Sequence, residues 1–211
     1  MKSLEFIYKR KSVRKYTADI VSEKDVIEIL EAATHAPSGK NLQNWHFVVV
    51  RNKEKIQELA TIIEEVTNKI ADLTEDADAK KGLLKYLKYF TFFKDAPVLI
   101  LVFASPYPNT PYDLLLNIGL KEEAERILYA SSGIQNIGAA MENLLLAAAN
   151  LGYGACWIAG PIYAGIEIER AIGFDKEGYK LVAMTPLGVP ESKEQLSPPR
   201  KPLEEVVTFI D

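Results

Sequence analysis

The segment KRKSVRKYT, residues 9–17, gathers five basic residues in a chain whose formal net charge is −4. Arg10 and Arg14 flank Ser12, which brings two guanidinium groups and a hydroxyl close together in the sequence. Guanidinium groups bind phosphate through paired, charge-assisted hydrogen bonds, each worth about 1.5–3 kcal/mol. These residue types therefore suit the phosphate group of a small ligand.

Two other interpretations of this segment stay open. A run of charged residues is often a solvated connector without a ligand, and a basic cluster can contact nucleic acid. The sequence pI near 5.4 argues against long nucleic-acid ligands, which require an extended basic face. Neither GxxxxGK[ST] nor GxGxxG occurs in the sequence, so no other phosphate motif competes for the role.

Cysteine and histidine are scarce. One Cys and two His provide neither a disulfide framework nor the spacing of a zinc site. His35 and His46 are isolated, so we expect structural roles for both, and we expect Cys156 to be an inert core thiol. The aromatic residues before position 94 are expected mainly in the core, with some bordering a cleft: Tyr86, Tyr89, Phe90, Phe92 and Phe93.

Length and composition predict a single globular domain over residues 1–211. Hydrophobic residues at 48% and charged residues at 26% exclude a disordered, collagen-like or coiled-coil chain. The N-terminus lacks a long apolar core, and the apolar runs are too short to span a bilayer. We therefore expect a soluble, cytoplasmic protein.

The first half of the chain must position the basic segment. A short helix beginning near Ser3 is expected to end where the segment begins, and Ser22 with Asp25 predicts a capping box for a second helix. The loop HAPSGKN follows. The pattern then predicts a strand at 45–50, a helix at 53–71, a turn at 72–80 and a helical stretch at 78–93.

The second half continues with a strand at 96–104 buried on both faces, a Pro-rich loop at 105–113 and a spine helix at 123–150. Gly152 and Gly154 indicate a helix C-cap and a tight entry to the sheet, and residues 154–161 are expected to form a strand followed by a loop. A helix at 166–172 and a strand at 179–190 complete an α+β fold.

The C-terminal tail contains prolines that prevent a helix, together with Val206, Val207, Phe209 and Ile210, which require burial. Such a tail often completes a sheet, its own or a partner's.

Five motifs, in this order, resemble the FMN-dependent nitroreductase family: RKSVRKY, APSGKNLQNWHFVVV, NLLLAAANLGYGACWIAG, PLGVP and RKPLEEVV. The resemblance covers nearly the whole chain and is weakest at about 53–95 and 105–125. It implies a nitroreductase-like α+β fold with a central, mostly antiparallel mixed sheet flanked by helices. It also implies an intertwined homodimer, with FMN at the subunit interface and the C-terminal tail extending onto the partner.

The resemblance implies roles for individual residues. The phosphate and ribityl end of FMN would be held by Arg10, Lys11 and Ser12, with Arg200 returning from the tail. Arg14 would lie nearer the pyrimidine edge. Backbone N–H groups of Ala159 and Gly160 would face the ring, which a glycine allows to approach closely. From the other subunit would come Pro37, Ser38 and Asn41.

The implied activity is that of an oxidoreductase in which NADH or NADPH reduces the flavin, which then reduces a nitroaromatic, a quinone or a similar small acceptor. No metal or protein nucleophile is required. Alternatives are dehalogenation, flavin fragmentation or enamide reduction on the same fold, or a non-catalytic FMN-binding regulatory protein. Three departures from the family pattern, at Asn44, Ala159 and Pro198, leave the substrate range more open than FMN binding.

Overall fold

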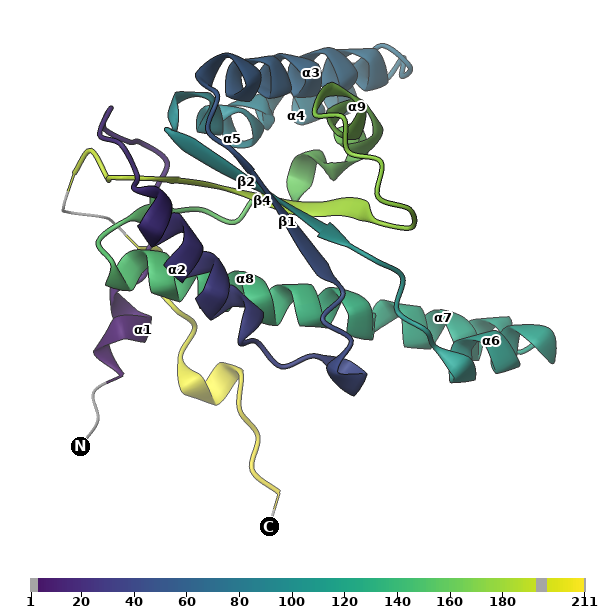
Figure 1. The fold of residues 1–211 in the computed structure, drawn as a ribbon. Helices are drawn as coiled ribbons and strands as arrows, with labels where there is room; N and C mark the ends of the chain where they lie inside the picture. Colours follow the sequence, from purple (N-terminus) through teal and green to yellow (C-terminus); the bar gives the residue numbers. More distant parts are fainter. Residues whose placement is uncertain (1–3, 193–196, 211) are drawn as a thin grey trace.

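A computed structural model describes residues 4–192 and 197–210 (Figure 1). Its centre is an antiparallel sheet with the strand order β1-β2-β4-β3. The strands are β1 (Trp45–Val50), β2 (Val98–Ala104), β3 (Gly154–Ala155) and β4 (Lys180–Gly188). An isolated parallel bridge joins Ser12 to Ala155 and so places the basic segment beside β3. The predicted α+β class and mostly antiparallel sheet are confirmed.

Strand β2 explains the uninterrupted apolar run in the sequence. Its side chains alternate between two cores: Val98, Ile100 and Val102 enter one cluster, whereas Leu99, Leu101 and Phe103 enter the other. Helices cover both faces of the sheet, so neither set of side chains needs to be polar.

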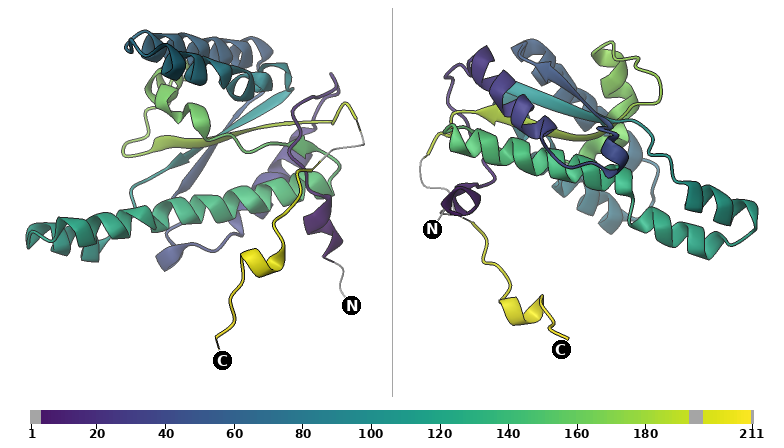
Figure 2. Two further views of the ribbon diagram at one scale, coloured as in Figure 1. Left: turned by 180° about the vertical axis from the view of Figure 1, so that it is seen from behind. Right: turned by 60° about the horizontal axis from the view of Figure 1, so that its bottom comes forward.

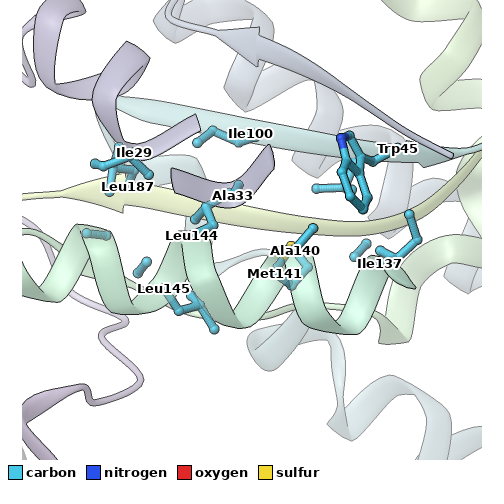
Figure 3. Close-up of a cluster of buried hydrophobic side chains, with 14 of the residues drawn as sticks. Ile29, Ala33, Trp45, Ile100, Ile137, Ala140, Met141, Leu144, Leu145 and Leu187 are labelled. Carbon is cyan, nitrogen blue, oxygen red and sulfur yellow. The ribbon is translucent and has the colours of Figure 1, made fainter. Parts of the chain in front are cut away.

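Helices α2 (Glu23–Thr34) and α8 (Ser132–Asn150) cover one face of the sheet. Figure 3 shows Ile137, Ala140 and Leu144 of α8 in this core. Truncating a fully buried leucine such as Leu144 to alanine costs about 2–5 kcal/mol. As predicted, the Ser22 side chain accepts the Asp25 N–H and caps α2.

The opposite face is covered by α3 (Lys53–Ala71) and α9 (Gly165–Ala171), with α4 (Ala77–Lys85) and α5 (Leu87–Phe90) beside α3. Helix α3 has the predicted bounds and begins after Asn52, whose side chain accepts the Lys55 N–H. The predicted stretch at 78–93 is interrupted at Tyr86 and Thr91 and ends in the 3-10 helix η2 (Phe92–Asp95). The predicted turn at 72–80 is too long, because Asp76 caps α4.

The predicted spine helix at 123–150 is two helices, α7 (Lys121–Tyr129) and α8, separated by Ala130 and Ser131. Both of these residues donate backbone N–H groups back into the end of α7. Helix α6 (Thr110–Asn117) begins inside the predicted Pro-rich loop, with Pro111 in its first turn, where a missing N–H is harmless. Helices α6 and α7 form a hairpin that projects beyond the sheet (Figures 1 and 2).

Three shorter segments complete the chain. Helix α1 (Glu5–Lys9) forms as predicted, although Ser3 lies outside the described residues. Gly152 has a φ of +86° directly after α8, which confirms the predicted C-cap. Residues 154–161, predicted as a strand followed by a loop, contain the short strand β3 and an Ile158–Met184 bridge, and the 3-10 helix η3 (Gly160–Ala164) begins before their end.

The tail, residues 197–210, does not join a sheet of its own chain. It contains the 3-10 helix η4 (Leu203–Glu205) and leads away from the body of the molecule (Figures 1 and 2). Val206, Phe209 and Ile210 are 61%, 87% and 94% exposed. In the described part of the chain, no helix has the length and apolar character needed to cross a membrane.

Candidate functional site

The basic segment is an extended stretch hydrogen-bonded to the sheet. The Val13 N–H donates to the Ala155 carbonyl at 2.9 Å, and the Thr17 N–H donates to the Val189 carbonyl at 2.9 Å. Val13 lies so close to β3 that a Cβ on Gly154 would be 2.6 Å from the Val13 Cβ. Gly154 is therefore needed for the approach of the segment, a packing role that the sequence alone did not indicate.

Arg10 is positioned by α8. Its Nε lies 3.6 Å from Oε1 of Glu142, and its side chain is only 19% exposed. Because the carboxylate faces Nε, the two terminal nitrogens of the guanidinium are available for a bidentate contact with phosphate. Glu142 is a residue that sequence reasoning missed.

Cys156 is the buried neighbour of three predicted site residues. Burial raises the pKa of its thiol, and Arg14, a Ser12 hydrogen bond and Arg10 oppose that shift. Ser12 thus contacts the Cys156 thiol directly, and Arg10 and Arg14 lie close enough to influence its pKa. At neutral pH the raised pKa keeps Cys156 protonated, in agreement with the inert thiol that we expected.

A cavity of about 500 Å³, hereafter the aromatic cavity, lies beside this cluster. It brings together three predicted residues, Arg14, Ala159 and Gly160. The remaining lining residues are Lys85, Tyr86, Tyr89, Phe90, Phe92, Cys156, Trp157 and Ile158. Of the aromatic residues expected mainly in the core, Phe93 is fully buried there, whereas Tyr86, Tyr89, Phe90 and Phe92 line the cavity.

The walls of the aromatic cavity are flat rings with cations beside them. Tyr86 and Phe90 are stacked, with ring centroids 6.0 Å apart and an interplanar angle of 17°. The Arg14 guanidinium carbon lies 5.9 Å from the centroid of Phe92. A Cβ on Gly160 would overlap the Phe90 ring, so in this chain the glycine already makes room for one flat ring. The cavity therefore offers aromatic surface and positive charge to a planar ligand.

Lys11 is directed away from this cavity. It lines a second cavity, of about 540 Å³, together with Val13, Tyr153 and Ala155. Successive side chains of an extended chain point to opposite sides, which separates Lys11 and Val13 from Ser12 and Arg14.

The remaining predicted residues lie elsewhere in the single chain. Pro37, Ser38 and Asn41 belong to the loop before β1, and Gly39 of that loop donates its N–H to Asn136 in α8. In the described part of the chain, the aromatic cavity is lined without these three residues. Arg200 lies in the exposed tail.

Both histidines lie away from the aromatic cavity. His46 packs against Phe174 and Tyr179, and burial, together with Lys176, lowers its imidazole pKa. His35 is exposed at the end of α2, where its backbone N–H caps the helix. These positions agree with the structural roles that we expected.

The chain belongs to the Nitroreductase family, whose sequence model matches residues 7–189. A relative from Archaeoglobus fulgidus, provisionally named an NADH dehydrogenase/NAD(P)H nitroreductase, is 33% identical over 80% of this chain and 72% of its own length. The iodotyrosine deiodinase of Thermotoga neapolitana is 26% identical over 94% of this chain and 92% of its own.

Solved structures agree with this assignment. A BluB-like flavoprotein from Clostridium difficile 630 is 40% identical, with a TM-score of 0.92 over the full length of both chains. A protein from Desulfovibrio desulfuricans, provisionally described as a nitroreductase in complex with FMN, is 27% identical, with a TM-score of 0.65 over 99% of this chain and 96% of its own.

Proposed function

We propose that the protein is an FMN-dependent oxidoreductase that uses NADH or NADPH as electron donor and reduces a small organic acceptor. The observation that carries this proposal is that Arg14, Ala159 and Gly160 line one aromatic cavity in a chain of the Nitroreductase family. Cys156 also lines this cavity, and Ser12 and Arg10 act on its thiol. When bound, FMN supplies the redox chemistry by accepting a hydride and passing electrons to a nitroaromatic, quinone or similar acceptor.

The donor set fits a flavin phosphate. Arg10 presents its terminal guanidinium nitrogens while Glu142 holds its Nε, and the Ser12 hydroxyl lies between Arg10 and Arg14 in the extended segment. Arg200 would add a second fork-shaped donor from the tail. Lys11 lines the neighbouring cavity, so we assign it a weaker, longer-range contribution to phosphate binding.

The aromatic cavity fits the flavin ring. Arg14 and Lys85 place two positive charges at its edge, which favours a ligand that gains electrons. Ala159 and Gly160 are exposed residues of its wall, and we propose that their backbone N–H groups donate hydrogen bonds to the ring. The stacked rings of Tyr86 and Phe90 provide an apolar part of its wall. The sequence alone indicated no role for Lys85.

We further propose that the working unit is a homodimer. The exposed Val206, Phe209 and Ile210 require an apolar partner surface, and β1 ends the sheet with one edge unpaired by any described strand. Pro37, Ser38 and Asn41 lie away from the aromatic cavity of their own chain, as expected of residues that serve the partner's site.

A visible spectrum of the purified protein, followed by anaerobic addition of NADH or NADPH, tests the proposal. We expect a yellow protein, or one that becomes yellow on addition of FMN, whose absorbance near 450 nm is bleached by at least one nicotinamide. A protein that does not take up FMN contradicts the proposed function. Flavin that binds but is reduced by neither nicotinamide would instead support a regulatory FMN-binding protein.

Reductive dehalogenation is a second candidate because iodotyrosine deiodinases match nearly the whole chain. Flavin fragmentation and enamide reduction on this fold remain the further alternatives. Stopped-flow oxidation of the dithionite-reduced protein separates nitro or quinone reduction from dehalogenation. Faster reoxidation by nitrobenzoate or a quinone than by iodotyrosine supports the first proposal, and the reverse order supports dehalogenation.

A further inference from the structure

The loop before β1, residues 37–43, has an unusual backbone. Lys40, Asn41 and Gln43 have φ angles of +57°, +50° and +46°, although none of them is glycine. This left-handed region is unfavourable for residues with a Cβ, and such conformations persist only where surrounding contacts fix them. Contacts with the rest of the structure must therefore hold this loop in its conformation.

Two buried asparagines provide these contacts. Asn136 is 6% exposed and Asn44 is 1% exposed. Asn136 Oδ1 accepts the Gly39 N–H at 3.0 Å, and Asn136 Nδ2 donates to Asn44 Oδ1 at 2.9 Å. Asn44 Nδ2 donates to the carbonyls of Ser105 and Gly133, both at 3.2 Å. One chain of hydrogen bonds thus joins the loop to the residue after β2 and to the first turn of α8.

Hydrogen bonds within the loop connect Gln43 to two predicted site residues, Ser38 and Asn41. Gln43 donates its backbone N–H to Ser38 Oγ at 3.0 Å and its side-chain amide to Asn41 Oδ1 at 3.2 Å. On the other side of the loop, a Cβ on Gly39 would lie 2.5 Å from Tyr107 Oη. Gly39 is therefore held between Asn136 and Tyr107, and the directions of the Ser38 and Asn41 side chains depend on it.

We propose that Asn44 and Asn136 are positioning residues that hold Ser38 and Asn41 in the conformation needed to contact the flavin of the partner subunit. The inference rests on the proposed function. Apolar residues in place of the pair would leave the Gly39 N–H without this acceptor and the Ser105 and Gly133 carbonyls without the Asn44 donor.

The direct test is Asn136→Ala, measured as the FMN dissociation constant by quenching of FMN fluorescence at a temperature where circular dichroism shows a folded protein. We expect FMN binding to weaken about tenfold. Asn143→Ala is the matched control, since Asn143 lies in the same helix and donates to the Ala32 carbonyl at 3.2 Å, away from the loop. It should change the dissociation constant by less than about twofold.

A double-mutant comparison separates positioning from general loss of stability. In a Ser38→Ala/Asn41→Ala background, adding Asn136→Ala should change the FMN dissociation constant by less than about twofold, because its targets are already gone. A further full tenfold loss there would overturn the proposal. So would an unchanged dissociation constant for Asn136→Ala in the otherwise native chain.

Two further measurements cover the remaining outcomes. If Asn136→Ala does not fold, Gly39→Ala displaces the loop against Tyr107 without unpairing an asparagine, and unchanged FMN affinity there would refute the proposal. If the native protein does not bind FMN, the proposed function fails. Hydrogen exchange then still tests whether the Asn44–Asn136 pair holds the loop. The Gly39 amide should then exchange faster in Asn136→Ala and not in Asn143→Ala.

Discussion

The Nε atom of Arg10 lies 3.6 Å from the Oε1 atom of Glu142, which ties the basic segment to the middle of α8. Because Glu142 is about half exposed, this pair adds little to the stability of the fold. Its importance is orientation, since it fixes the stem of Arg10 while the end of the guanidinium stays available to a ligand.

Replacing Arg10 by alanine should weaken FMN binding by about 1–3 kcal/mol, which is roughly tenfold to a hundredfold, because a charge-assisted bidentate contact is lost. Arg200→Ala should act in the same direction. Fluorescence titration with FMN measures both effects. Lys9→Ala is the control, since Lys9 is engaged with Glu5 at 3.0 Å on the surface of α1 and should leave affinity nearly unchanged. Unaltered affinity in both arginine variants would refute the phosphate assignment.

A shared site can be tested by mixing two defective proteins. If Arg10 of one subunit and Asn41 of the other serve the same flavin, a heterodimer of Arg10→Ala and Asn41→Ala contains one intact site and one doubly defective site. Unfolding and refolding an equal mixture should then restore about a quarter of the native high-affinity FMN sites. Each variant refolded alone provides the baseline. A mixture that binds no better than this baseline would show that each site is built from one chain.

The packing of Gly160 against Phe90 predicts a steric effect. Gly160→Ala places a Cβ inside the Phe90 ring and should destabilise the protein by about 1–3 kcal/mol, as overpacking does, while also weakening FMN binding. Urea unfolding and FMN titration are the measurements. Phe90→Leu should partly rescue both properties if the clash is the cause.

Gly82→Ala is the matched control for this experiment. Gly82 lies inside α4 and has no atom within 4 Å of its ideal Cβ, so alanine there should stabilise the protein by about 0.5–1 kcal/mol. Equal losses of stability in both glycine variants would contradict the steric explanation.

The Tyr153–Asp25 hydrogen bond predicts a pH dependence of stability. Tyr153 Oη donates to Asp25 Oδ2 at 2.6 Å, which lowers the carboxyl pKa and raises the phenol pKa. A lowered carboxyl pKa contributes stability above the unfolded pKa, and that contribution is lost as the pH falls through the folded pKa. Tyr153→Phe should therefore have a lower Tm than the native protein at pH 7.

The difference in Tm between the native protein and Tyr153→Phe should shrink below about pH 4, where unfolded carboxyl groups are protonated. The raised phenol pKa sets the alkaline limit in the same way, because its contribution is complete below the unfolded pKa and is lost as the pH rises through the folded one. Tyr129→Phe, at a fully exposed tyrosine, serves as control. A Tm difference that stays constant from pH 3 to pH 7 would rule out this explanation.

The long elements could be predicted because their signals are local. Strand β1 and helix α3 have the predicted bounds, since a β-branched run and an apolar period of 3.6 are each visible in one short window of sequence. The break between α7 and α8 was missed because Ala130 and Ser131 are neither glycine nor proline. The starts of α4 and α6 did carry signals, a capping Asp76 and a first-turn Pro111, which were assigned to loops.

The site could be predicted in part. Arg10, Ser12 and Arg14 could be nominated from the sequence because their chemistry is concentrated in one short segment. Lys85 and Glu142 received no assignment from the sequence, because their proximity to that segment depends on how α4 and α8 pack around the sheet. The direction of Lys11 likewise depends on the pairing of residue 12 with Ala155, which composition does not indicate.

The hydrogen bonds of the basic segment have a consequence for biosynthesis. The basic segment with Arg10, Ser12 and Arg14 precedes its backbone partners, Ala155 and Val189, by most of the length of the chain. Contacts between such distant parts of a chain cannot form until both parts have been synthesised. The proposed phosphate-binding wall is therefore completed only after Val189 has emerged. Under the proposed function, the flavin phosphate is bound only from that point of synthesis onward.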